Sequence, residues 1–137
     1  MATESEFSED RLCSLAVSAM RKSYAPYSNF NVGAALLTAD HRVYLGANIE
    51  NASFSATVCA ERVALQSAVF DGARNFTMLA IAGGKDGEIT APCQPCGVCR
   101  QALCEFCGPD LRVLLVKPNG KHEEYTLAEI FPLAFKM

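Results

Sequence analysis

Helical periodicity is clear in three long segments of the chain. Apolar residues at helical spacing predict a first helix from about Ser5 to Ser23, with acidic residues near its start and basic residues near its end, as the helix dipole favours. A second helix is predicted from about Cys59 to Phe70, with Gly72 placed to end it. A third should begin near Pro95 and end at Gly108-Pro109.

Between these helices, short apolar runs bounded by turn residues predict about five strands. They are Val32–Thr38, Arg42–Ala47, the run 77–84 and two strands flanking the Asn119-Gly120 turn. Thr126 and Glu129 have the spacing of a capping box, which predicts a last short helix. The pattern predicts a sheet of about five strands with helices packed on it, in one domain spanning residues 1–137.

Composition narrows the class of protein. The 137 residues are 50% apolar and carry a net charge of −3 without a basic cluster, which argues against a nucleic-acid binder. No apolar run approaches the ~18 residues that span a membrane, and the acidic, polar start does not resemble a secretory signal. Seven cysteines, an odd number, are better explained by thiols or metal ligands in a reducing compartment than by disulfides. We expect a cytoplasmic protein that binds neither nucleic acid nor membrane.

Five of the seven cysteines lie in the stretch APCQPCGVCRQALCEFC, where two Pro-Cys-x-x-Cys patterns share Cys96. Their spacing near a helix start makes Cys93, Cys96 and Cys99 candidate metal ligands, because the helix dipole stabilises thiolates there. An iron–sulfur motif would place the next cysteine one position earlier than Cys104 and follow it with proline. A redox dithiol also fits C-x-x-C. We expect the remaining three cysteines to be packing residues: Cys13, Cys104 and Cys107.

A dithiol would leave the segment Cys59-Ala60-Glu61 unexplained. Cys59 stands at the predicted start of the second helix, where a thiolate again gains from the dipole. Glu61 alone would be interpreted as a charge that complements that dipole. Three thiolates from two helix starts, however, leave one position open on a tetrahedral zinc, which is typical of a catalytic site. A glutamate that is not a ligand then moves protons beside the metal, and this constellation is the signature of zinc deaminases.

The chain resembles the small, homotetrameric cytidine deaminases in several motifs: SYAPYSNFNVGAALLT, GANIENASFS, VCAERVAL, PCGVCRQ and EIFPLAF. The resemblance implies an α/β fold, a single-domain αβα sandwich with a mixed sheet of about five strands and helices on both faces. It also implies one Zn²⁺ per subunit, held by Cys59, Cys96 and Cys99. Glu61 would be the proton shuttle, and Arg62 would hydrogen-bond the ligand thiolates.

The same resemblance assigns a nucleoside pocket. Asn48 and Glu50 would hydrogen-bond the sugar hydroxyls, and Phe30 and Ala60 would contact the nucleoside. Phe135 would stack on the base in a neighbouring subunit's site, so that sites are shared within a homotetramer. Phe54 stands where relatives often have a tyrosine that reaches the sugar.

These features predict hydrolytic deamination of cytidine and 2′-deoxycytidine to the uridines, a reaction of pyrimidine salvage. Two alternatives stay open at this point. The first is a deaminase of another aminated nucleoside, such as a nucleoside antibiotic, which Phe54 favours. The second is a non-enzymatic module stapled by a closed zinc site, in which Cys93 is the fourth ligand.

Overall fold

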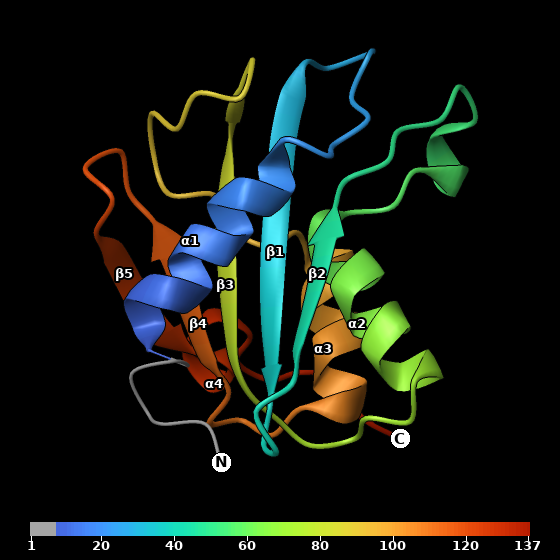
Figure 1. The fold of residues 1–137 in the computed structure, drawn as a ribbon. Helices are drawn as coiled ribbons and strands as arrows, with labels where there is room; N and C mark the ends of the chain where they lie inside the picture. Colours follow the sequence, from blue (N-terminus) through green and yellow to red (C-terminus); the bar gives the residue numbers. More distant parts are fainter. Residues whose placement is uncertain (1–7) are drawn as a thin grey trace.

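The computed structural model describes residues 8–137 as a five-stranded sheet with helices on both faces (Figure 1). In chain order the elements are α1 (Glu9–Met20), β1 (Phe30–Thr38), β2 (Val43–Ala47), the 3₁₀ turn η2 (Phe54–Ala56), α2 (Ala60–Phe70), β3 (Phe76–Lys85), α3 (Gly97–Phe106), β4 (Arg112–Val116), β5 (His122–Thr126) and α4 (Leu127–Ile130). The strand order is β2-β1-β3-β4-β5. Among these five strands β3 and β4 pair in parallel, the other neighbouring strands pair antiparallel, and α3 forms the crossover between β3 and β4.

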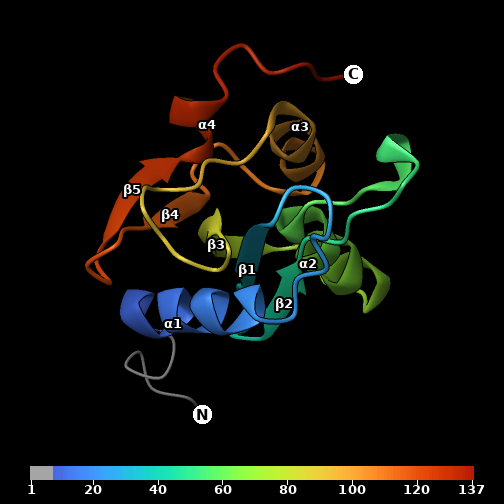
Figure 2. The ribbon, with the colours of Figure 1, turned by 90° about the horizontal axis from the view of Figure 1, so that it is seen from above.

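The sheet separates two apolar cores, and Figure 2 shows α1 on one face with α2, α3 and α4 on the other. Alternation along β1 produces this division, because successive side chains of a strand point to opposite faces. Ala34 and Leu36 belong to the core beneath α2 and α3. Ala35 and Leu37 belong to the core beneath α1. The predicted sandwich, with its mixed five-stranded sheet covered on both sides, is confirmed.

The helix boundaries differ in part from those predicted. α1 is shorter than the predicted Ser5–Ser23: Ser8 has extended backbone and its hydroxyl caps the helix by accepting from the Arg11 N–H, and the helix ends at Met20. Ser5 lies outside the described residues. α3 starts at Gly97 with Cys96 as its N-cap, so Pro95 precedes the helix instead of opening it.

Other local predictions are confirmed. The capping box of Thr126 and Glu129 is present at α4. Gly120 has a φ of +82° in the turn between β4 and β5, a conformation that glycine adopts without steric cost. Cys13 and Cys107 are buried in the two cores, and Cys104 packs against one of them. No helix within residues 8–137 is long and apolar enough to cross a membrane.

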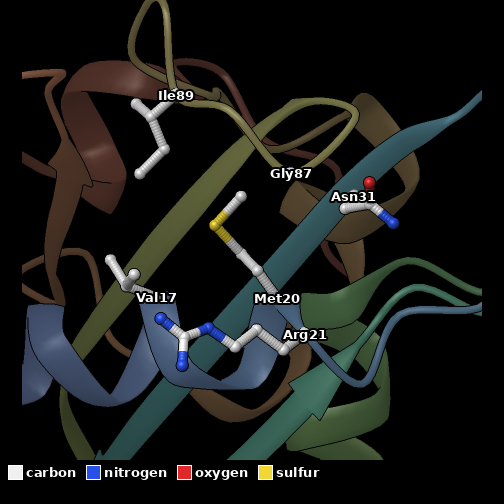
Figure 3. Close-up of a pocket in the computed structure, with 6 residues that line it drawn as sticks. All are labelled: Val17, Met20, Arg21, Asn31, Gly87 and Ile89. Carbon is white, nitrogen blue, oxygen red and sulfur yellow. The ribbon is translucent and has the colours of Figure 1, made fainter.

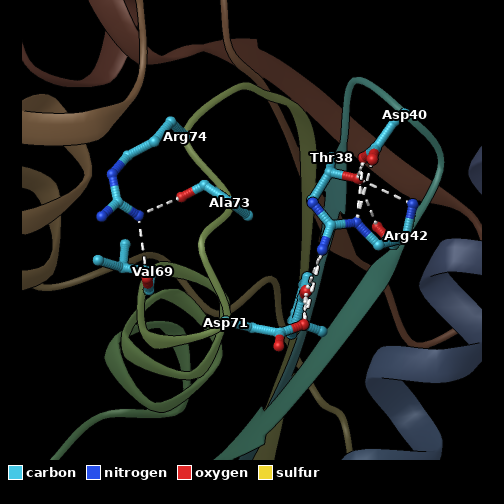
Figure 4. Close-up of polar contacts among 8 residues, drawn as sticks. Thr38, Asp40, Arg42, Val69, Asp71, Ala73 and Arg74 are labelled. Carbon is cyan, nitrogen blue, oxygen red and sulfur yellow. Dashed lines mark hydrogen bonds and ion pairs between the residues drawn. The ribbon is translucent and has the colours of Figure 1, made fainter.

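Polar contacts hold together the end of the sheet where β1 turns into β2 (Figure 4). The Thr38 hydroxyl donates to Asp40 and accepts from the Arg42 N–H at 2.8 Å. The Arg42 guanidinium reaches Asp71 at 3.6 Å, and Arg74 donates to the Val69 carbonyl oxygen in the last turn of α2 and to the Ala73 carbonyl oxygen in the loop that follows. These contacts connect the β1–β2 turn to the C-terminal end of α2. The starts of α2 and α3 lie at the opposite end of the sheet.

Candidate metal centre and its pocket

Three cysteine thiols meet where α2 and α3 begin. Cys59 is the N-cap of α2 and Cys96 the N-cap of α3, and neither side chain caps its helix by a hydrogen bond. Cys99 lies in the first turn of α3 and is fully buried. The three sulfur atoms lie within 4.8 Å of one another, with 3.6 Å between Cys59 and Cys96 and 3.4 Å between Cys96 and Cys99.

This spacing fits zinc. Sulfur atoms at tetrahedral positions about 2.3 Å from zinc lie about 3.8 Å apart, close to the distances between these thiols. Cys93 is not a member of the cluster. The donor set therefore supplies three ligands and leaves the fourth tetrahedral position open towards the adjoining pocket.

The thiols also have the electrostatics of a cation site. A hydrogen bond from Cys99, with smaller contributions from Arg62 and Cys96, lowers the pKa of Cys59 to about 5. The hydrogen bond to Cys59, followed by burial, raises the pKa of Cys99 far above its ordinary value. One thiolate forms readily, whereas a second beside it is unfavourable until a cation enters. Both helix N-termini add positive partial charge at the same place.

Glu61 is buried in the first turn of α2, with 3% of its surface exposed, and lines the pocket beside the cluster. Burial raises the pKa of its carboxyl to about 7. A carboxyl that titrates near neutral pH both accepts and donates a proton under working conditions, as a general acid–base group must.

Arg62 lies behind Cys59. One guanidinium nitrogen is 3.7 Å from the Cys59 sulfur and 3.5 Å from the Thr57 carbonyl oxygen. Its Nε is buried and finds no hydrogen-bond partner in residues 8–137. A cation at this position offsets part of the negative charge that three thiolates place on a zinc site.

The adjoining pocket has a volume of about 260 Å³. Its metal side is formed by Cys59, Ala60, Glu61 and Cys96, and its outer side by Ser28, Phe30, Asn48 and Glu50. The rest of its wall is formed by Val32, Thr57, Val58, Cys93 and Gln94. The structure thus brings together every residue that the sequence assigned to one chain's nucleoside pocket.

On the outer side of this pocket, the side chains of Asn48 and Glu50 are held in place by hydrogen bonds to neighbouring residues. The Asn48 side-chain oxygen Oδ1 accepts from the Ser23 hydroxyl at 2.5 Å and from the Val32 N–H at 2.9 Å, and its side-chain NH₂ donates to the Phe30 carbonyl oxygen at 2.8 Å. One amide hydrogen of Asn48 is left over. Glu50 accepts from two backbone N–H groups and the Ser28 hydroxyl, and the hydroxyl bond leads the lowering of its pKa. The pair offers a ligand one donor and one charged acceptor.

Phe135 and Cys93 differ in how they lie relative to this pocket. Phe135 does not line its own chain's pocket: the side chain is 67% exposed, and its carbonyl accepts from the Gln101 amide at 3.1 Å. Cys93, which the sequence marked as a spare thiol or a fourth ligand, forms part of the pocket wall. Burial raises the pKa of this thiol to about 12, with a smaller contribution from Glu61. No local signal in the sequence distinguishes this wall position from a ligand position.

Two other features lie away from the metal centre. A cavity of about 370 Å³ on the α1 face is lined by Val17, Met20, Arg21, Asn31, Gly87 and Ile89 (Figure 3). Glu9, His122 and Glu124 also lie close together. Arg112 pairs with both carboxylates of that cluster, which makes it an ion-pair network.

The chain is similar to known proteins in both sequence and structure. The family model for the cytidine and deoxycytidylate deaminase zinc-binding region matches residues 7–115. A cytidine deaminase of Sporosarcina psychrophila is 44% identical over 126 residues, which cover 92% of this chain and 90% of that protein. The crystal structure of cytidine deaminase from Burkholderia pseudomallei matches with a TM-score of 0.86 and 42% identity, over 93% of this chain and 99% of that one. The blasticidin-S deaminase of Bacillus cereus is 34% identical over 109 residues, 77% of this chain and 76% of that protein.

Proposed function

The chain belongs to the cytidine and deoxycytidylate deaminase family, and on that premise we propose that it hydrolyses cytidine and 2′-deoxycytidine to the uridines with release of ammonia. The observation that carries the proposal is the buried carboxyl of Glu61 beside three thiols that fit zinc with one position open. A closed structural zinc has four protein ligands and needs no such carboxyl. The site therefore favours an enzyme over a zinc-stapled module.

The chemistry is divided between the metal and Glu61. Cys59, Cys96 and Cys99 would hold one zinc ion per chain, which would supply an activated water at neutral pH. Glu61 accepts a proton from the attacking water and delivers it to N3 of the base as C4 becomes tetrahedral. It then passes the second proton of the nucleophile to the amine at C4, which leaves as ammonia. Arg62 moderates the charge of the ligand thiolates.

The nucleoside is held at both ends. The spare amide hydrogen of Asn48 and the remaining lone pair of Glu50 suit two neighbouring sugar hydroxyls. Ala60 is the first residue of α2, where a backbone N–H has no partner within the helix and can serve the base carbonyl. Phe30 lines the pocket beside Asn48. The described residues that line this pocket include no lysine or arginine, which favours a nucleoside over a nucleotide.

A nucleoside antibiotic is the second candidate substrate. The Bacillus cereus relative is named for blasticidin S, and Phe54, 82% exposed beside the pocket rim, lacks the hydroxyl expected there. The higher identity to a cytidine deaminase supports cytidine as the main substrate. Parallel assays with cytidine and blasticidin S measure the preference directly, and a larger kcat/KM for blasticidin S would reverse the proposal.

We further propose a homotetramer in the cytoplasm, acting in pyrimidine salvage. Phe135 is exposed and outside its own pocket, as a residue that completes a neighbour's site would be. All seven cysteines are free, which suits a reducing compartment. Light scattering that gives a monomer mass at assay concentration would contradict the assembly.

The test of the activity follows the ultraviolet absorbance of cytidine with zinc-loaded protein. Glu61→Gln should lose about 10²–10⁴ in kcat, because a general acid–base residue contributes that much. The matched control is Glu105→Gln, an exposed glutamate on α3, which should keep the full rate. An active Glu61→Gln protein would remove Glu61 from the mechanism, and a wild type that binds zinc without turnover would refute the cytidine proposal.

A further inference from the structure

Cys93 is a half-buried thiol that packs against the core beneath α2 and α3 and also lines the pocket. It lies in the loop between β3 and α3, outside the three-sulfur cluster but on the wall of the same pocket as Glu61. A deaminase needs no thiol at this place for proton transfer or for the zinc. Its contribution to the reaction must therefore lie in the shape of the pocket.

The backbone of Gly83, which carries no side chain, fixes the position of the Cys93 side chain. A β carbon built on Gly83 of β3 would stand 2.8 Å from the Cys93 sulfur, 2.9 Å from its β carbon and 3.2 Å from Val32. The thiol thus rests directly on the sheet next to Val32. Because the sheet blocks any retreat, a larger side chain at position 93 must extend into the pocket, and a smaller one must widen it.

The polar groups of the pocket determine which part of a base this wall meets. N3 and the amine of cytosine must face Glu61 and the metal, and the sugar must face Asn48 and Glu50. The C5–C6 edge is the one edge of the ring without a hydrogen-bonding group. Val32, Val58 and Cys93 are the apolar wall residues that remain for it, since an apolar edge is best matched by apolar side chains, and of these Cys93 rests on the bare backbone of Gly83.

We propose that Cys93 is a specificity-determining residue whose thiol limits the size of the substituent accepted at C5 of the pyrimidine. The inference rests on the proposed deaminase function and adds to it a substrate range. A single extra methyl group in an apolar pocket changes kcat/KM by about 10–200-fold where the wall cannot yield.

The experiment compares kcat/KM for cytidine and 5-methylcytidine in the zinc-loaded wild type, Cys93→Ala and Cys93→Leu. Cys93→Ala should raise the ratio of 5-methylcytidine to cytidine by about tenfold, and Cys93→Leu should lower it by at least as much. Cys104→Ala, a half-buried thiol packed against the core under α3, is the matched control and should leave the ratio unchanged. All proteins should retain one zinc per chain.

Two results would overturn the proposal. An unchanged ratio in both Cys93 variants with zinc retained would show that the wall is elsewhere, and loss of zinc from Cys93→Ala would make Cys93 a ligand. Calorimetric Kd values of both nucleosides for Glu61→Gln protein, with and without Cys93→Ala, separate this proposal from the proposed function. If Cys93→Ala changes the ratio of the two Kd values but the wild type shows no turnover, the role of Cys93 in the pocket wall is supported and the proposed deaminase function is refuted. If neither nucleoside binds, both proposals are overturned.

Discussion

Replacing Gly46 of β2 by alanine should lower the activity, because the new methyl group would displace α2, which carries part of the metal centre. A β carbon at Gly46 would stand 2.3 Å from the Ala60 carbonyl oxygen and 2.6 Å from the Ala64 nitrogen. Both are backbone atoms of α2, so no side-chain rotation relieves the clash. An ordinary contact is about 3.5 Å, which means that the helix must recede by about 1 Å.

That movement acts on the metal centre because α2 carries two of its parts. Cys59 directly precedes α2 and Glu61 lies in its first turn, whereas Cys96 directly precedes α3 and Cys99 lies in the first turn of α3. A displacement of about 1 Å between reacting groups costs about 10²-fold in rate. Overpacking should also lower the free energy of unfolding by about 1–3 kcal/mol.

The assay measures kcat/KM for cytidine, zinc per chain and Tm, with two glycine controls. A β carbon at Gly33 would stand 2.1 Å from the Ala16 carbonyl oxygen on α1, so Gly33→Ala should lose comparable stability on the other face of the sheet while keeping most of its kcat/KM. Gly97→Ala has nothing within 4 Å of the new carbon and should change neither. If Gly46→Ala is destabilised but keeps the wild-type kcat/KM, the packing of α2 against β2 does not determine the geometry of the metal centre, and the reasoning is refuted.

Three further predictions concern charge, metal and capping. Burial raises the pKa of Glu61 from 4.5 to about 7, so the folded, metal-stripped protein binds more protons than the unfolded chain between these values. The Cys59 thiol, whose pKa is lowered to about 5, acts in the opposite sense in the upper part of this window, in the wild type and in Glu61→Gln alike. The free energy of unfolding of the wild type, measured with urea, should therefore fall relative to that of Glu61→Gln by up to about 3 kcal/mol as pH rises through this window; parallel curves would contradict this. Cys96→Ser should lose zinc as measured by elemental analysis, while Cys104→Ser keeps it, and equal zinc contents would exclude Cys96 as a ligand. Thr126→Ala removes the capping box with Glu129 and should cost about 1 kcal/mol, seen as a lower Tm at unchanged kcat/KM, whereas an unchanged Tm would show that the cap contributes nothing.

Much of the fold was predictable because its signals are short in range. The Asn119-Gly120 turn, the Thr126 cap and the apolar alternation of β1 each depend on residues a few positions apart. The same holds for half of the metal centre, since Cys96 and Cys99 share one helix start. The ends of α1 were predicted less well, because a helix boundary depends on capping contacts such as that of Ser8 with the Arg11 N–H, which the apolar periodicity does not show.

The sequence by itself determined the chemistry: three thiols at two helix starts, a glutamate beside one of them, and no basic surface for nucleic acid. The tertiary structure decided what these groups do together. Cys59 and Cys96 are 37 positions apart and meet only because α2 and α3 begin at the same end of the sheet. Cys93 lies in a loop without periodicity, where no local rule sets the direction of a side chain. Its place on the pocket wall follows from the bare backbone of Gly83, a contact that only the folded chain creates.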